Sequence, residues 1–134
     1  MKTLLASAAA VALSAGMAVA DYKITILHTN DFHARFEPVS KYDSGCGEDD
    51  NAEGKCFGGS ARLVTAINEA RARSDNSILV DGGDQFQGTL FYTYYTGNLA
   101  AEMMNKLGYT DMPVCNHEIA DEPEVLRGVV DAEN

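Results

Sequence analysis

The sequence predicts an α/β protein with a small and mainly parallel sheet. Three short segments, residues 22–28, 78–80 and 112–114, have the β-branched and apolar composition of strands. The segments between and after them have helical periodicity and carry residues that start or stop helices. Because strands that alternate with helices form crossover units, the order β-loop-α-β-α-β-α implies parallel pairing of the strands.

Each predicted strand has its own signal. "YKITILH", residues 22–28, is apolar, aromatic or β-branched at most positions, which is typical of a parallel strand covered on both faces. "ILV", residues 78–80, is a short buried strand that leads into a Gly-rich turn. "MPV", residues 112–114, is expected to form a third strand, although Pro113 has no N–H to donate to a central ladder.

The helix boundaries follow from capping residues. Ser60 is predicted to cap a helix with an apolar face that consists of Leu63, Val64, Ile67 and Ala70. Thr89 is predicted to cap the next helical stretch, with a break at Gly97 and a stop at Gly108. Pro123 suits the first turn of a final helix that runs to the end of the chain.

Residues 1–20 are predicted to be a secretory signal peptide. Lys2 precedes a short apolar stretch at residues 4–13, and Ala18-Val19-Ala20 fits the small-residue cleavage pattern. The apolar stretch is too short to span a bilayer, and a membrane-anchoring helix is the weaker alternative. Residues 21–134 are then expected to be part of one domain of an exported protein, periplasmic or secreted, with no membrane anchor.

Export permits disulfides, and the chain has three cysteines. Cys46 and Cys56 bracket a polar stretch within a long loop at residues 37–58, and they are predicted to pair. Closing a loop of this size stabilises the fold by about 2–3 kcal/mol on the chain-entropy model. Cys115 is left over, either as a free thiol or for pairing between chains.

The formal net charge of −10 at pH 7 excludes some classes of partner. Such an acidic surface repels a nucleic-acid backbone and an anionic membrane. It is compatible with a small anion, because a bound divalent metal reverses the sign of the charge locally.

Polar clusters follow all three predicted strands: "NDFH" at 30–33, "DGGDQ" at 81–85 and "CNHE" at 115–118. The carboxyl ends of parallel strands lie at one edge of the sheet, where open α/β proteins bind ligands. Carboxylate, imidazole and amide side chains together suit Zn, Mn or Fe. The expected convergence involves Asp31, His33, Asp81, Asp84, Asn116, His117 and Glu118.

Four segments resemble the 5'-nucleotidase family within the calcineurin-like metallophosphoesterases: "ILHTNDFHARFEP", "GGSARLVTAINEARA", "LVDGGDQFQGTLFYTYYTG" and "CNHE". They occur in the order found in the family, and the resemblance extends over nearly all of residues 21–134. The resemblance implies the N-terminal part of an αββα sandwich, with the second sheet and the C-terminal substrate domain absent.

The resemblance also implies roles for single residues. Asp31 and His33 correspond to ligands of a first metal, and Asp84 to a ligand that bridges two divalent ions, Zn, Mn or similar. Asn116 corresponds to a ligand of the second metal that also contacts the phosphate, and His117 to the catalytic histidine. The implied reaction is hydrolysis of a small phosphate ester, above all a nucleoside 5'-monophosphate, by metal-activated water.

Three other polar residues near the expected metal ligands are not assigned as ligands. His28 still belongs to its strand and is interpreted as structural. Asp81 and Glu118 are interpreted as groups that cap or support the metal ligands.

The chain departs from the family pattern in two ways. Cys115 stands where the family has glycine, and Ala120 stands where an aspartate orients the catalytic histidine; Asp121 is an alternative partner. The family also takes further histidine ligands from downstream segments, so a truncated chain is expected to bind the second metal weakly. The alternative function is therefore a non-catalytic fragment that binds metal or phosphate.

Overall fold

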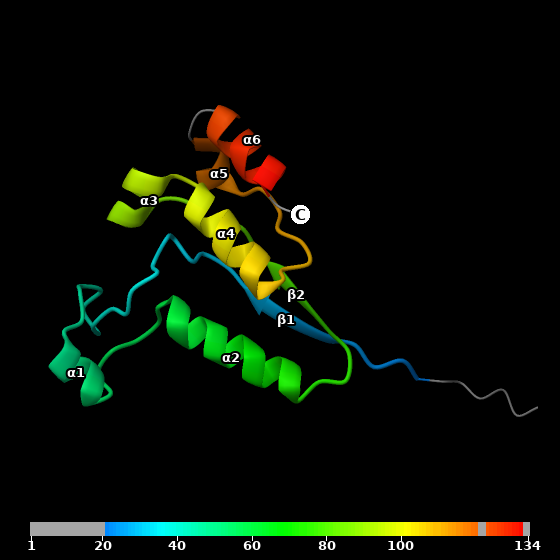
Figure 1. The fold of residues 1–134 in the computed structure, drawn as a ribbon, viewed down its shortest axis with the longest axis horizontal. Coiled ribbons are helices and arrows are strands. Elements are labelled where there is room, and N and C mark those ends of the chain that lie inside the picture. Colours follow the sequence, from blue (N-terminus) through cyan, green and yellow to red (C-terminus); the bar gives the residue numbers. More distant parts are fainter. Residues whose placement is uncertain (1–20, 121–122, 133–134) are drawn as a thin grey trace, which may run out of the picture.

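The computed structural model describes residues 21–120 and 123–132. The predicted signal peptide and Asp121 lie outside the described residues. The described chain forms a two-stranded parallel sheet, β1 (Thr25–Thr29) and β2 (Ser77–Asp81), with helices packed beside it (Figure 1). The two strands pair in register, with Leu27 opposite Leu79 and Thr29 opposite Asp81. The predicted α/β class and the parallel pairing are thus confirmed.

The main core lies on one face of this sheet. Leu79 of β2 packs with Ile67 of α2 (Ser60–Ala72) and with Met104 and Leu107 of α4 (Asn98–Leu107). The other face is open in the described residues, because Ile24 and Ile26 are 49% and 61% exposed. The expectation that the first strand is covered on both faces is therefore wrong for this part of the chain. The apolar residues of β1 lie on both faces of the sheet, but α2 and α4 both cover the face that carries Leu79.

The predicted third strand does not form. Residues 112–114 have no strand conformation, and Asp111 makes a single parallel bridge to Val80. The N–H of Asp81 donates to the carbonyl of Asp111 at 3.0 Å, so the pairing begins. It stops there because Pro113 has no N–H with which to continue a ladder.

The helix that begins at Ser60 is confirmed, but its cap is not. Gly59 is the N-cap residue, and Ser60 is already helical, with its hydroxyl donating to the carbonyl of Phe36 at 2.9 Å. A side chain at Gly59 would meet the backbone nitrogen of Pro38 at 2.9 Å, and its φ is +85°. The close approach of the preceding loop therefore decides the start of α2.

The other predicted helix starts, the break at Gly97 and the stop at Gly108 are confirmed, whereas the predicted end of the last helix at residue 134 lies outside the described residues. The Thr89 hydroxyl accepts a hydrogen bond from the N–H of Phe91 at the start of α3 (Leu90–Tyr95). Gly97 separates α3 from α4, and Gly108 ends α4 with a left-handed φ of 66°. Pro123 opens α6 (Pro123–Ala132). A second apolar cluster joins α3, α4 and α6 around Phe86, Ala101 and Val129.

The long polar loop is more ordered than its composition predicts. It contains a short helix, α1 (Glu48–Ala52), and Val39 forms isolated antiparallel bridges to Gly45 and Phe57. The predicted disulfide between Cys46 and Cys56 is present, with 5.8 Å between the Cα atoms. Cys115 is a free thiol.

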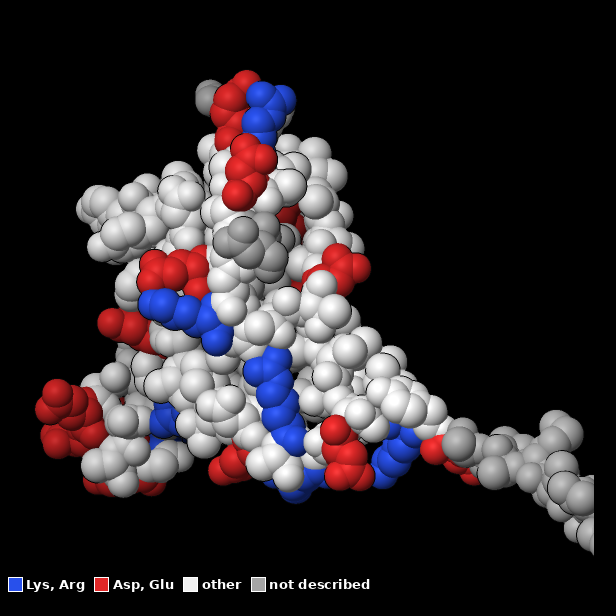
Figure 2. Space-filling model, turned by 45° about the vertical axis from the view of Figure 1, so that its right-hand side comes forward, with Lys and Arg blue, Asp and Glu red and all other residues white. Residues whose placement is uncertain are grey.

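The surface is acidic overall but mixed locally. On the face drawn in Figure 2, basic and acidic side chains lie beside one another, and no broad basic area is seen there. No helix within residues 21–120 or 123–132 combines the length and apolar character that crossing a membrane requires.

Candidate metal centre

Backbone hydrogen bonds join the segments that follow β1 and β2. The N–H groups of Asp31 and His33 donate to the carbonyls of Gly83 and Asp84 at 3.0 and 3.1 Å. Two predicted polar clusters are thereby held side by side at the carboxyl edge of the sheet. The third polar cluster lies at the start of α5 (Asn116–Ala120), a short helix that was not predicted from the sequence.

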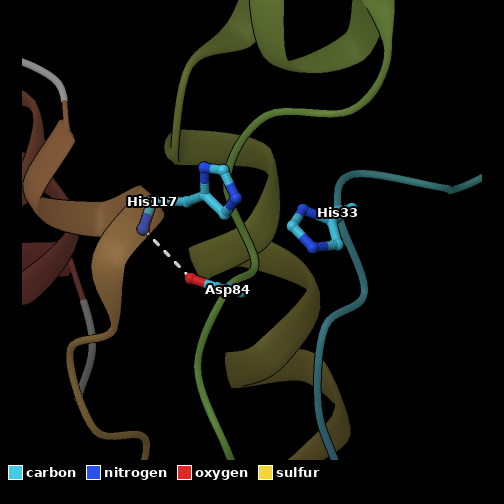
Figure 3. Close-up of side chains that lie close together, drawn as sticks. All are labelled: His33, Asp84 and His117. Carbon is cyan, nitrogen blue, oxygen red and sulfur yellow. Dashed lines mark hydrogen bonds between the residues drawn. The ribbon is translucent and has the colours of Figure 1, made fainter.

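Three side chains from these segments converge. The potential ligand atoms of His33, Asp84 and His117 all lie within 4.8 Å of one another (Figure 3). The rings of the two histidines meet edge to face, with 4.9 Å between their centroids. Asp31 lies at the margin of this group, with its Oδ1 at 3.7 Å from Nε2 of His33.

These distances fit a transition-metal ion. Two ligand atoms bound to one ion at about 2.1 Å lie about 3.0–3.4 Å apart. The separation of 3.7 Å between Asp31 and His33, and the grouping within 4.8 Å, therefore need only small side-chain adjustments. Nitrogen and carboxylate donors without thiolate suit Zn or Mn. His28 lies on β1, outside this group.

The tautomer of His33 follows from its hydrogen bond. Nδ1 lies 3.1 Å from the carbonyl oxygen of Phe86, and a carbonyl only accepts. Nδ1 therefore carries a hydrogen, and in the neutral ring the lone pair is on Nε2, on the side of Asp31. A backbone carbonyl that fixes the second nitrogen in this way is typical of histidines that bind metals.

Asp84 is the hub of the group and is buried, with 7% exposure. Its Oδ1 accepts from the N–H of His117 at 3.0 Å, and its Oδ2 lies 3.2 Å from Nδ2 of Asn116 in the favoured orientation of that amide. The N–H of His117 is the main reason that the pKa of the Asp84 carboxyl lies below its usual value. The Cys115 thiol lowers this pKa further, whereas burial raises it.

Glu118 is a buried carboxylate of α5, and its hydrogen bonds hold the loop at residues 84–86 against this helix. Its two oxygens accept from four backbone N–H groups at 2.7–3.2 Å, those of Asp84, Gln85, Phe86 and Cys115. The side chain is 1% exposed, so these bonds are shielded from water. The supporting role predicted for Glu118 is confirmed by these contacts.

Asp81 has the supporting role predicted for it as well. Its Oδ1 accepts from the N–H of Gly83 at 2.8 Å, and its Oδ2 accepts from the hydroxyl of Thr29. The Thr29 hydrogen is used in that bond, so the hydroxyl of Tyr109, 2.7 Å away, must donate to Thr29. Burial is the main cause that raises the pKa of the Tyr109 phenol.

Backbone strain is concentrated at this edge of the sheet. Asp31, His33, Asp84 and Gln87 have φ values of 53°, 51°, 56° and 63°. Residues with a side chain rarely adopt this left-handed region, and such outliers cluster at functional sites. Gly83 relieves one crowded point, since a Cβ there would meet the Cβ of Cys115 at 2.6 Å.

The ring of His117 has a partner that sequence reasoning missed. Its Nδ1 lies 2.9 Å from Oε1 of Gln87. Ala120, at the position where the family has aspartate, is exposed at the end of α5. The only sequence signal for Gln87 is its place in "DQFQG", directly before the glycine that turns the loop.

The fold and the strand-end site define a metallophosphoesterase, and comparisons with known proteins agree. Residues 24–127 match the family model described as calcineurin-like phosphoesterase. The chain belongs to this calcineurin-like phosphoesterase family, the members of which use divalent metals.

Relatives by sequence and by structure include several 5'-nucleotidases. The chain is 46% identical over 98 residues to snake venom 5'-nucleotidase of Naja atra, and 44% identical over 105 residues to human 5'-nucleotidase. These matches cover 72% and 78% of this chain but 17% and 18% of the relatives. The structure of the 5'-nucleotidase precursor of Thermus thermophilus has a TM-score of 0.67 and 35% identity, with 81% of this chain and 20% of that chain covered. The chain thus spans about a fifth of the length of these proteins.

Proposed function

We propose that this chain supplies the N-terminal half of a dinuclear metal site that hydrolyses phosphate esters, above all nucleoside 5'-monophosphates. The observation that carries the proposal is the convergence of His33, Asp84 and His117 within 4.8 Å, in segments that match 5'-nucleotidases. We assign residues 21–134 to part of the catalytic domain.

We propose the roles that the resemblance to 5'-nucleotidases implies, and the contacts of each side chain support them. Nε2 of His33 and the carboxylate of Asp31 would hold one metal, and the carboxylate of Asp84 would be shared between this metal and the second. The Asn116 side chain, which lies beside Asp84, would serve the second metal and the phosphate. When bound, two divalent ions lower the pKa of a water molecule and neutralise charge on the phosphoryl oxygens. His117 stabilises the leaving group through Nε2, the ring nitrogen that Gln87 does not engage.

We also propose export to the periplasm or beyond the cell. The predicted signal peptide and the disulfide between Cys46 and Cys56 support this location, because disulfides persist in oxidising compartments. Three snake venom 5'-nucleotidases among the relatives are consistent with it. The proposed partner is a small nucleotide or phosphate ester and not a nucleic-acid polymer.

A chimera tests the catalytic proposal. The matching segment of the Thermus thermophilus 5'-nucleotidase precursor is replaced by residues 21–134, and release of phosphate from AMP is measured with Mn²⁺. We expect turnover, and its loss when Asp84→Asn is added. The matched control is Asp75→Asn, because Asp75 is an exposed acid in the turn before β2, away from the site. A folded chimera that binds Mn²⁺ without releasing phosphate would refute the proposed catalysis.

A second candidate function is metal or phosphate binding without catalysis. It is favoured by one contact, since the Asn116 amide donates to Asp84 and leaves the second metal few ligands among the described residues. Calorimetric titration of the full chain with Mn²⁺ tests it. We expect binding that weakens at least about tenfold in Asp84→Asn and is unchanged in Asp75→Asn. Equal binding by all three proteins would exclude a metal role for Asp84.

A further inference from the structure

We propose that Gln87 is the positioning residue for His117, in place of the aspartate that Ala120 replaces. This inference rests on the proposed catalytic role of His117. Its basis is the distance of 2.9 Å between Gln87 Oε1 and His117 Nδ1, across 30 residues of sequence. Gln87 belongs to a different element from His117, so the contact is made by the tertiary fold and not by a helix turn.

The loop that carries Gln87 is held firmly on both sides. Before it, the N–H groups of Gln85 and Phe86 donate to the buried carboxylate of Glu118 at 2.7 and 3.2 Å. After it, Gly88 has a φ of +99°, and a Cβ there would meet the carbonyl oxygen of His33 at 2.4 Å. A side chain projected from such a clamped turn has few alternative positions.

The left-handed backbone conformation of Gln87 is a second indication that the surrounding structure fixes this residue. Its φ is 63°, in a region that a residue with a long side chain adopts only when its surroundings impose it. The segment around it is packed between His33 on one side and α5 on the other. The strained backbone therefore occurs at the residue whose side-chain amide contacts the ring of His117.

The chemistry of the contact determines the tautomer of His117. An amide oxygen only accepts, so Nδ1 of His117 must carry the hydrogen. Nε2 is then the ring nitrogen left to take up a proton and donate it to the leaving oxygen, as the proposed role requires. A glutamine holds the ring as an aspartate would, but it adds no full negative charge beside it. Ala120, with only a methyl group, offers no such contact.

Ring ¹⁵N NMR of the full chain at a pH where its histidines are neutral tests this inference. The chain has three histidines, and substitution of each assigns its signals. We expect the Nδ1–H form to dominate at His117. In Gln87→Asn, which keeps an amide but is one methylene too short, this form should become the minor one. Gln87→Glu, which keeps the length and an acceptor oxygen, should restore it.

His33 is the internal control, because its Nδ1 donates to a backbone carbonyl that no variant removes. Its unchanged signals would show that each variant is folded at the site. An unchanged His117 tautomer in a folded Gln87→Asn variant, or an Nε2–H form in the unsubstituted chain, would overturn the inference. The measurement needs neither metal nor turnover, so its failure is distinct from failure of the AMP chimera.

Discussion

The buried carboxylate of Glu118 offers the sharpest test of how this site is held together. Glu118→Gln keeps the shape of the side chain and one acceptor oxygen. The other oxygen becomes an NH₂ group that faces two backbone N–H donors. Whichever way the amide is turned, two of the four N–H groups now bonded to Glu118 lose their acceptor.

The expected cost follows from burial. A buried donor left without an acceptor costs about 1–3 kcal/mol, and two of them cost about 2–6 kcal/mol. Water cannot compensate readily, because the Glu118 side chain is 1% exposed. A domain of this size is stable by about 5–15 kcal/mol, so the substitution removes a large share of the free energy of unfolding.

Urea denaturation followed by circular dichroism measures this loss. With a slope of about 2 kcal/mol per molar urea, the midpoint should fall by about 1–3 M. Glu102→Gln is the matched control, because Glu102 is paired with Lys106 on the exposed face of α4. That exchange should change the free energy of unfolding by less than about 1 kcal/mol. Equal effects of the two substitutions would refute the view that Glu118 holds the loop at residues 84–86.

Three further predictions concern stability. Replacing Cys46 and Cys56 together by serine should lower the free energy of unfolding by about 2.7 kcal/mol in urea titrations, and no loss would contradict the loop-closure argument. Leu79→Ala should cost about 2–5 kcal/mol in the same assay, since Leu79 is 1% exposed at the centre of the core; a cost typical of surface positions would show that the core is misplaced. Tyr109 has a raised pKa, so the folded state holds its proton more tightly than the unfolded state does. The associated stability is complete below its ordinary pKa of 10.0 and is lost as pH rises through the raised value. Tyr109→Phe should remove that part of the alkaline loss in thermal melts from pH 9 to 12, and an identical pH profile would exclude the phenol as its source.

Local signals in the sequence determined much of the fold. Thr89 caps α3 and Gly108 ends α4 because a hydroxyl acceptor and a left-handed turn act within a few residues. The pairing of Cys46 with Cys56 is similarly short in range. The polar clusters after β1 and β2 were predicted to meet, because parallel strands end at the same edge of a sheet.

Tertiary structure decided the features that depend on distant neighbours. Gly59 caps α2 because Pro38 passes close to it, and the sheet has an open face because both packing helices lie on the side of Leu79. Gln87 reaches His117 across 30 residues, a contact that no periodicity or local propensity encodes. Composition and spacing thus determined which residue types stand at the strand ends. Which of them touch depends on long-range packing, since a hydrogen bond across a loop exists only once the backbone on both sides is fixed.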